Sequence, residues 1–189
     1  EENRLALIVY ANGTRSTAAY DGDGLVRRRE DPTESFKLIW DGRNPLQTTS
    51  LADVTQAQHT LEPAGYGKLL SRKAGTERRY AHYDGGGSTR RLTNQNQTET
   101  DGYLYDAFCR LITSSGATVW APRYVGQLLY LTHTASGLIY VRARYYDPVR
   151  GRWGTRDVPE EGPNLYGYVG NNPVGRVDPS GLADDTIPW

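Results

Sequence analysis

Residues 103–111 read Tyr-Leu-Tyr-Asp-Ala-Phe-Cys-Arg-Leu, and the Tyr105-Asp106 pair at their centre suggests how the chain folds. A tyrosine suits the end of a strand, because its flat ring covers a pleated surface while its hydroxyl reaches water or the backbone. The Asp106 carboxylate can accept backbone N–H bonds and form an Asx-turn. Arg110 and Leu111 then open a returning strand, so the stretch predicts a β-hairpin.

An aromatic residue followed by Asp recurs along the chain. The pairs are Tyr20-Asp21, Trp40-Asp41, Tyr83-Asp84, Tyr105-Asp106 and Tyr146-Asp147. Successive pairs are separated by one or two multiples of about 21 residues, and the skipped positions fall near Tyr66 and Tyr124. A unit of this length holds two strands and two turns. Because one hairpin is marginally stable alone in water, neighbouring units must pair edge to edge.

We therefore predict an all-β fold in which antiparallel hairpin repeats form a spiralling or curled sheet or shell, with an irregular C-terminal plug. The alternative is that each pair marks an ordinary hairpin turn with no period behind it. The composition favours strands and tight turns, with 14 Tyr against 2 Phe and with 21 Gly, the residue that most easily adopts positive φ.

The charge balance and the apolar pattern exclude some classes of partner. The 22 basic and 22 acidic side chains cancel, so the chain has no basic field for nucleic acid or anionic lipid. It contains no run of about 18 apolar residues, so we expect no transmembrane segment. The chain begins at Glu1 without Met or a signal peptide, so we expect a processed product or a fragment.

We expect no metal and no cofactor. Cys109 is the single cysteine, which excludes an internal disulfide and a thiolate metal cluster. His59, His82 and His133 are scattered and lack the spacing of a zinc site. With the histidines so dispersed, we also expect no Ser-His-Asp arrangement.

From residue 80 onward the sequence resembles the Rhs-repeat core, or YD-repeat, family. The stretches that carry the resemblance are YAHYDGGGSTRRLTN (80–94), YLYDAFCRL (103–111), GLIYVRARYYDPVRGRW (137–153) and NLYGYVGNNPVGRVDPSGL (164–182). The clear match covers roughly the last 100 residues. The resemblance implies a hollow β-shell around an effector, closed by a plug that acts as an intramolecular aspartic protease and cuts once, between Leu182 and Ala183.

On this basis we expect a repeat region over residues 1–141, a plug over 142–182 and a short tail over 183–189. The expected function is a structural β-shell segment that encapsulates or delivers a C-terminal effector, with at most one turnover of self-cleavage. The expected partners are the chain's own C-terminal segment, further copies of the chain, or secretion machinery. The resemblance also implies a bacterial protein that is secreted or held at the cell surface.

An aspartic protease needs two carboxylates that share a proton, so that one is ionised and the other neutral. We expect Asp157 and Asp178 to form this pair, with Arg156 assisting and Asp147 in reserve. Each Asp also has a structural interpretation. Asp178-Pro179-Ser180-Gly181 is an ideal type I turn sequence, Asp147-Pro148 reads the same way, and Arg156-Asp157 could be a surface ion pair.

The sequence departs from the family pattern in three places. Cys109 stands where the family usually has Gly, so that turn must either avoid positive φ or be strained. Val158 follows Asp157 where Pro is usual, and only residues 183–189 follow the cut position. The short tail favours an alternative function, a self-assembling extracellular subunit that forms a fibre or tube through open sheet edges without catalysis.

Overall fold

The computed structural model describes residues 4–156 and 164–186. Within these residues, eleven strands form one antiparallel sheet in which each strand pairs with its neighbours in the sequence. The strands are β1 (Leu7–Val9), β2 (Arg15–Tyr20), β3 (Val26–Glu30), β4 (Phe36–Asp41), β5 (Asn44–Thr49), β6 (Thr55–Leu61), β7 (Leu69–Ala74), β8 (Glu77–Tyr83), β9 (Thr89–Asn94), β10 (Glu99–Tyr105) and β11 (Leu111–Ser115). We call residues 4–115 the strip. The strip confirms the predicted all-β class and its antiparallel hairpins.

The rest of the described chain, residues 116–156 and 164–186, forms what we call the C-terminal block. It contains a sheet of β12 (Leu131–Thr132), β13 (Ile139–Val141), β14 (Arg144–Asp147) and β15 (Arg152–Trp153), and a pair of short strands, β16 (Arg176–Val177) and β17 (Asp185–Thr186). Two 3-10 turns, η1 (Gly126–Leu128) and η2 (Val169–Asn171), complete the block within these ranges. The predicted boundary at 141/142 falls in the turn between β13 and β14, and that division into domains stays a prediction.

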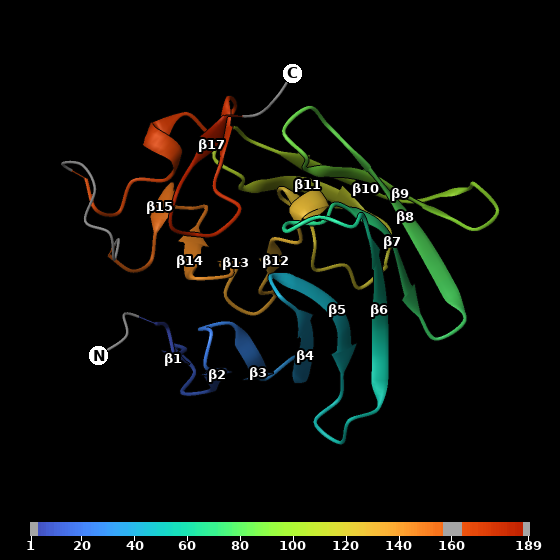
Figure 1. The fold of residues 1–189 in the computed structure, drawn as a ribbon, viewed down its shortest axis with the longest axis horizontal. Coiled ribbons are helices and arrows are strands. Elements are labelled where there is room, and N and C mark those ends of the chain that lie inside the picture. Colours follow the sequence, from blue (N-terminus) through green and yellow to red (C-terminus); the bar gives the residue numbers. More distant parts are fainter. Residues whose placement is uncertain (1–3, 157–163, 187–189) are drawn as a thin grey trace.

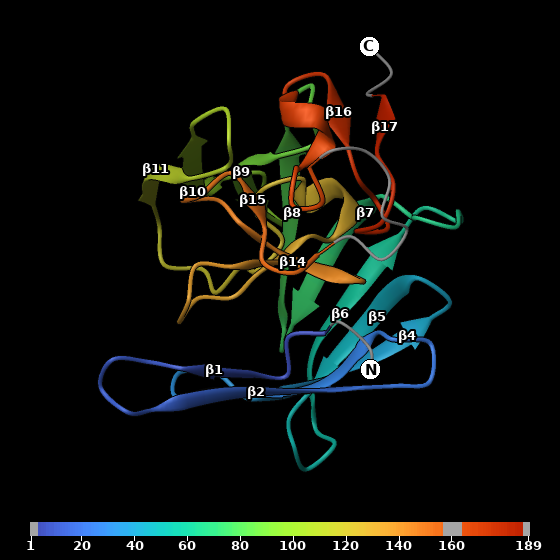
Figure 2. The same ribbon diagram turned by 90° about the vertical axis from the view of Figure 1, so that its left-hand side faces the viewer.

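The strip curves around the C-terminal block. In Figure 1 it runs from β1 below the block, past β6 and β7 at the right, to β10 and β11 beside the upper part of the block. The view turned by 90° shows the block on the inner side of the same curve (Figure 2). The order of pairing stays open from β1 to β11, so the sheet is curled and does not close on itself in the described residues.

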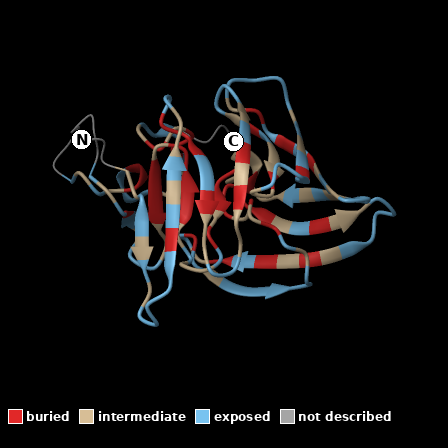
Figure 3. Cartoon of the chain, turned by 90° about the horizontal axis from the view of Figure 1, so that it is seen from below, coloured by how far each residue is buried: buried red, intermediate tan, exposed pale blue. Residues whose placement is uncertain are grey.

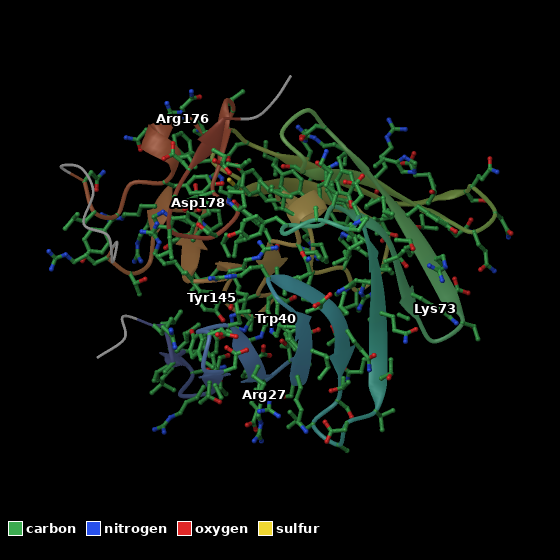
Figure 4. The ribbon with its side chains drawn as sticks, in the orientation of Figure 1. Arg27, Trp40, Lys73, Tyr145, Arg176 and Asp178 are labelled. Atoms are coloured by element: carbon green, nitrogen blue, oxygen red, sulfur yellow. The ribbon has the colours of Figure 1, made fainter. Side chains whose placement is uncertain are left out.

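The core lies between the strip and the block. Buried residues concentrate where the two meet, and the outer faces and hairpin tips are exposed (Figure 3). The main cluster joins Val26, Phe36, Leu38, Leu69, Leu92, Tyr103 and Tyr105 of the strip to Trp120, Leu129, Leu131, Tyr140 and Tyr145 of the block. Figure 4 shows Trp40 and Tyr145 in this contact region, whereas Arg27 and Lys73 point away from the block. The strip therefore buries part of its inner face against the block, which offsets the low stability of its hairpins in isolation.

One turn geometry recurs along the strip. At Asp106, the backbone N–H donates to Arg110 O (3.0 Å), and Cys109 N–H donates back to Asp106 O (3.1 Å). The Asp106 Oδ1 atom accepts the N–H groups of Phe108 and Arg110, each at 3.0 Å. The same two backbone bonds, with a side-chain oxygen accepting the N–H four residues on, recur in the turns that begin at Asp21, Ser50, Asp84 and Asn94. We call this arrangement the repeat turn.

The fourth residue of the repeat turn has positive φ. Gly24 and Gly87 adopt φ of 80° and 81°, which glycine tolerates because it has no Cβ. Cys109 occupies the same place at φ 79°. The sequence left open whether the turn at Cys109 avoids positive φ or is strained, and the structure shows the strained backbone. The Cys109 side chain is buried among the aromatic rings of Tyr124 and Tyr146.

The Trp40-Asp41 pair behaves differently. Both residues belong to β4, and Asp41 pairs with Asn44 across a tight two-residue hairpin whose first turn residue, Gly42, has φ 54°. The Trp40 indole N–H donates to Val26 O (2.9 Å) and so ties β4 to β3.

Among the described residues, no helix is long and apolar enough to cross a bilayer.

Candidate functional site at the Asp178 turn

The turn at Asp178 is a repeat turn placed inside the block. Gly181 N–H points to Asp178 O (3.4 Å), and Gly181 has φ 77°, as the fourth residue of a repeat turn does. Asp178 Oδ1 accepts the N–H of Leu182, four residues on, at 3.1 Å. It also accepts the N–H groups of Gly181 (2.8 Å) and Ala183 (3.1 Å) and the hydroxyl of Ser180 (3.0 Å). One carboxylate oxygen thus holds both residues of the predicted cut, Leu182 and Ala183.

The backbone carbonyls of this turn are held by the surrounding block. Each carbonyl from residue 178 to 181 accepts a hydrogen bond, and the donors, in that order, are Tyr130 OH (2.5 Å), Arg142 Nη1 (2.7 Å), Ala143 N (3.2 Å) and Arg144 Nε. The donors come from the β13–β14 turn, from the first residue of β14 and from the residue before β12, so the fold of the block fixes the turn in place.

Position 181 requires glycine because of its positive φ and because nearby backbone atoms leave no space for a Cβ atom. A Cβ atom built at this position would lie 2.2 Å from Val141 O and 3.1 Å from Arg144 N. Both are backbone atoms of the β13–β14 hairpin, which cannot move aside without breaking its strand pairing. The Gly of the DPSGL sequence therefore allows the turn to sit against this hairpin.

Burial dominates the electrostatics of Asp178. The residue is 3% exposed. Burial raises the pKa of its carboxyl above the ordinary value, although hydrogen bonds from Ser180 and the backbone and the charge of Arg144 oppose that shift. Arg144 Nη2 lies 3.6 Å from Asp178 Oδ2, and the guanidinium stacks 4.3 Å from the centre of the Trp153 ring. The site thus joins a buried carboxyl with a raised pKa to a buried arginine.

The acceptor of the hydrogen bond from Asp178 N–H distinguishes this turn from the repeat turns of the strip. In those turns, the first residue donates its N–H to the carbonyl four residues on. Here Asp178 N–H donates to the Tyr130 hydroxyl (3.0 Å). No hydrogen bond from the described residues reaches Leu182 O, the carbonyl of the predicted cut. Figure 4 shows Asp178 in the interior of the block.

The other predicted catalytic residues are not brought to this turn in the described part of the chain. Asp157 lies outside the described residues, and Arg156 is the last residue before that gap. Asp147 forms a surface Asx-turn, in which Oδ1 accepts the N–H groups of Val149 (2.9 Å) and Arg150 (3.1 Å). The roles assigned to Asp157, Asp178 and Arg156 stay predictions.

Sequence reasoning missed Tyr130 and Arg144. Arg144 belongs to the stretch that carries the family resemblance, and its spacing from Asp147 gave no sign that it would face Asp178. Tyr130 had no signal, because a tyrosine in an apolar stretch indicates only a core position. Both are brought to Asp178 by tertiary packing across more than thirty residues of sequence.

The segment after the predicted cut folds back onto the block. β17 pairs with β16, with Arg176 opposite Thr186 and Val177 opposite Asp185. Arg176 Nη1 also pairs with Asp184 Oδ2 at 2.6 Å on the surface. Figure 4 shows Arg176 at the outer end of the block.

A Ser-His-Asp arrangement does occur, contrary to the expectation from sequence. His133 Nε2 lies 2.8 Å from Asp31 Oδ2, and Ser136 Oγ lies 2.7 Å from His133 Nδ1. Folding brings Asp31 next to His133 across 102 residues of sequence. His133 is 1% exposed and lies where the strip meets the block, so its contact with Asp31 links the two parts away from solvent. Among the described residues, no group of three or more His, Cys, Asp or Glu side chains could hold a metal ion.

The sequence and the fold are both similar to those of known proteins. The chain is 30% identical to the probable deoxyribonuclease RhsB of Dickeya dadantii over 96% of its own length, and 40% identical to the toxin subunit YenC2 of Yersinia entomophaga over 36%. It superposes with a TM-score of 0.73 and 21% identity on the crystal structure of TcdB2-TccC3 without its hypervariable C-terminal region, covering 95% of this chain and 10% of that one.

The matched regions are small parts of long proteins. The chain spans 13% of RhsB and 8% of YenC2. No family model matches it. The similarity to RhsB nevertheless extends across nearly the whole chain, including the first 80 residues, where the sequence showed only the aromatic-Asp period. By these relationships the chain belongs to the Rhs/YD-repeat family and is homologous to its repeat region over nearly its whole length.

Proposed function

We propose that this chain is a wall segment of an Rhs/YD-repeat shell that encloses a C-terminal effector, and that its Asp178 turn is the junction at which the effector segment is cut off. The shell role is supported by the open, curled sheet. Within the described residues, β1 and β11 each have one unpaired edge, so the curved strip can be extended by further hairpins on both sides, as a longer repeat protein requires. The likeness to the TcdB2-TccC3 fold supports the same role.

The cut at Leu182–Ala183 is supported by one observation above all. The Leu182 carbonyl receives no hydrogen bond from the described residues, and it lies beside a firmly held amide. Asp178 Oδ1 lies 3.1 Å from the nitrogen of Ala183, which is the leaving atom of the reaction. A water molecule would attack the Leu182 carbonyl carbon while an ionised carboxylate takes its proton. As the carbon–nitrogen bond breaks, the leaving nitrogen needs a second proton. Asp178 Oδ1 accepts the hydrogen that this nitrogen already carries and so holds it in place, and the proton comes from the carboxyl that took it from the water.

The second carboxylate of this scheme is Asp157, which takes the proton from water. We assign the assisting positive charge to Arg144 as well as to the predicted Arg156, because Arg144 contacts both Gly181 O and Asp178. Delivery to the outside of a bacterial cell, by secretion machinery or within a larger toxin assembly, follows from the same proposal. The related structures include a Tc holotoxin pore, and this chain would serve as one part of an assembly of that kind.

Intact-mass measurement of the purified chain tests the cleavage. The wild-type chain should lose residues 183–189, and Asp157→Asn and Asp178→Asn should each keep them. Asp106→Asn is the matched control, since it changes the same kind of turn on the strip and should leave cleavage unaffected. A wild-type chain that keeps its full mass after prolonged incubation under native conditions would remove self-cleavage from the proposal.

The alternative, assembly into filaments through the sheet edges, is favoured by one observation. β1 presents Leu7 and Val9, which are 49% and 60% exposed, and β11 presents Ile112, which is 57% exposed. Edge strands of this kind can template the addition of another copy. Light scattering of the purified chain over a range of concentrations should then show growing assemblies, whereas a constant monomer mass would exclude them.

A further inference from the structure

The Asp178 turn keeps the shape of a repeat turn but lacks its closing hydrogen bond. At Asp84 the N–H donates to Ser88 O at 3.0 Å, and at Asp106 the N–H donates to Arg110 O at 3.0 Å. This bond starts the returning strand and points the carbonyl of the fifth residue into the turn. At Asp178 the equivalent acceptor would be Leu182 O.

Tyr130 takes the place of that acceptor. Its hydroxyl accepts Asp178 N–H at 3.0 Å and donates to Asp178 O at 2.5 Å, so one side-chain group satisfies both backbone groups of Asp178. Tyr130 is 0% exposed, and its ring is held edge-on against Tyr124 with the ring centres 6.1 Å apart. Burial raises the pKa of the Tyr130 hydroxyl, so it stays protonated and able to donate.

Because the Tyr130 hydroxyl accepts Asp178 N–H in place of Leu182 O, the Leu182 carbonyl is left free of the turn. A buried N–H without an acceptor is costly, so without the Tyr130 hydroxyl Asp178 N–H would bond to Leu182 O as in the other turns. The Leu182 carbonyl would then point into the turn. A water molecule and two carboxylates could no longer flank it, because one face would be covered by the turn itself.

We propose that Tyr130 is a positioning residue that holds the Asp178 turn open and so exposes the Leu182 carbonyl for the cut. This inference rests on the proposed self-cleavage for its functional meaning, and its structural half can be tested without it. Tyr130 acts through the backbone of Asp178 and takes no proton in the reaction.

The chain offers a matched control for Tyr130. Tyr140 is also buried, at 2% exposed, and its hydroxyl also accepts a backbone N–H, that of Val26 at 2.8 Å. This bond joins the strip to the block and does not touch the junction. Tyr130→Phe and Tyr140→Phe therefore remove the same atom from the same kind of bond, and only the first should affect the cut.

The experiment follows cleavage over time by intact mass in the full chain and its two variants. Tyr130→Phe should cut at least about tenfold more slowly than wild type, whereas Tyr140→Phe should cut at the wild-type rate even where it lowers stability as much. Equal slowing by both variants, or no slowing by Tyr130→Phe, would overturn the proposal.

A second measurement does not require any cleavage. Heteronuclear NMR detects a scalar coupling across a hydrogen bond between an amide nitrogen and the accepting carbonyl carbon. In the uncut Asp157→Asn background, adding Tyr130→Phe should create a coupling between Asp178 N and Leu182 C′. If the wild-type chain is never cut but this coupling appears, the proposed function fails and the role of Tyr130 in the turn stands. If the coupling does not appear, the role of Tyr130 is wrong.

Discussion

The turns at Asp106 and Asp178 have the same local design in opposite environments. Each uses an Asp carboxylate to accept N–H bonds from the next residues, and each has a fourth residue with φ near 80°. Asp106 lies at a strand end and pairs with the exposed Arg110 at 3.1 Å. Asp178 is buried and faces Arg144 and Tyr130.

Under the proposed function, the same kind of turn serves structure at Asp106 and chemistry at Asp178. At the end of a strand, the carboxylate is solvated and the turn joins two strands. Inside the block, burial raises the pKa of the Asp178 carboxyl, and Tyr130 replaces the bond that would close the turn. The Asp178 turn thereby keeps the carboxylate bonds of a repeat turn and lacks its closing bond, as the proposed cleavage requires.

The largest loss in the free energy of unfolding should come from adding a side chain at Gly181. Gly181→Ala would place a methyl group 2.2 Å from Val141 O at a positive φ, so we expect the free energy of unfolding to fall by about 4 kcal/mol. Gly13→Ala is the control, because Gly13 has φ 80° and a methyl group added there would meet no atom within 4 Å, and it should cost about 1 kcal/mol. Urea unfolding of both variants measures the two values, and equal losses would show that the fit against β13–β14 is unimportant.

The next largest effect is the difference in stability loss when each of the two carboxylates, Asp178 and Asp106, is removed. Asp178→Ala leaves Gly181 N–H without its side-chain acceptor and removes the carboxylate that lies 3.6 Å from Arg144, so it should cost about 3 kcal/mol. Asp106→Ala removes a solvated turn bond and should cost about 1 kcal/mol, in the range of a lost helix cap. Chemical unfolding again gives the comparison. Similar losses at the two sites would contradict the claim that burial separates them.

The smallest effect concerns pH. Because the folded-state pKa of Asp178 is raised, the folded chain takes up this proton more readily than the unfolded chain. The cost of the buried charge is fully present above the folded pKa and disappears as pH falls towards the unfolded value of about 3.9. Wild type should therefore gain stability relative to Asp178→Asn on acidification, by up to about 1.4 kcal/mol for each unit by which the pKa is raised. A difference that stays constant or moves the other way between pH 7 and pH 4 would refute the raised pKa.

Much of the strip could be predicted from sequence, because its signal is local. An aromatic residue and an Asp at a strand end predict a turn wherever they occur, and the period of about 21 residues predicts that the hairpins pair in order. The turns at Ser50 and Asn94 were missed, although they form the same bonds. Their side-chain oxygens act as the Asp oxygen does, so the pattern was defined by one residue type where the chemistry allows three.

The site was predicted less completely, because it depends on contacts between distant segments. The DPSGL sequence indicates a tight turn at Asp178, which the structure shows, but nothing in the sequence places that turn inside the block. Tyr130 lies 48 residues before Asp178, and no local pattern connects the two. The Asp31–His133 contact spans 102 residues and was likewise invisible. Sequence reasoning here identifies turns and strands, whereas their burial is set by packing.

The central claim is that the Asp178 turn is a repeat turn held open, and couplings across hydrogen bonds in the uncut chain test it most directly. We predict a coupling from Asp106 N to Arg110 C′ and none from Asp178 N to Leu182 C′, while both amides are protected from exchange. A coupling of equal size at both turns would show that the Leu182 carbonyl is closed like the others, and the account of the junction would be wrong.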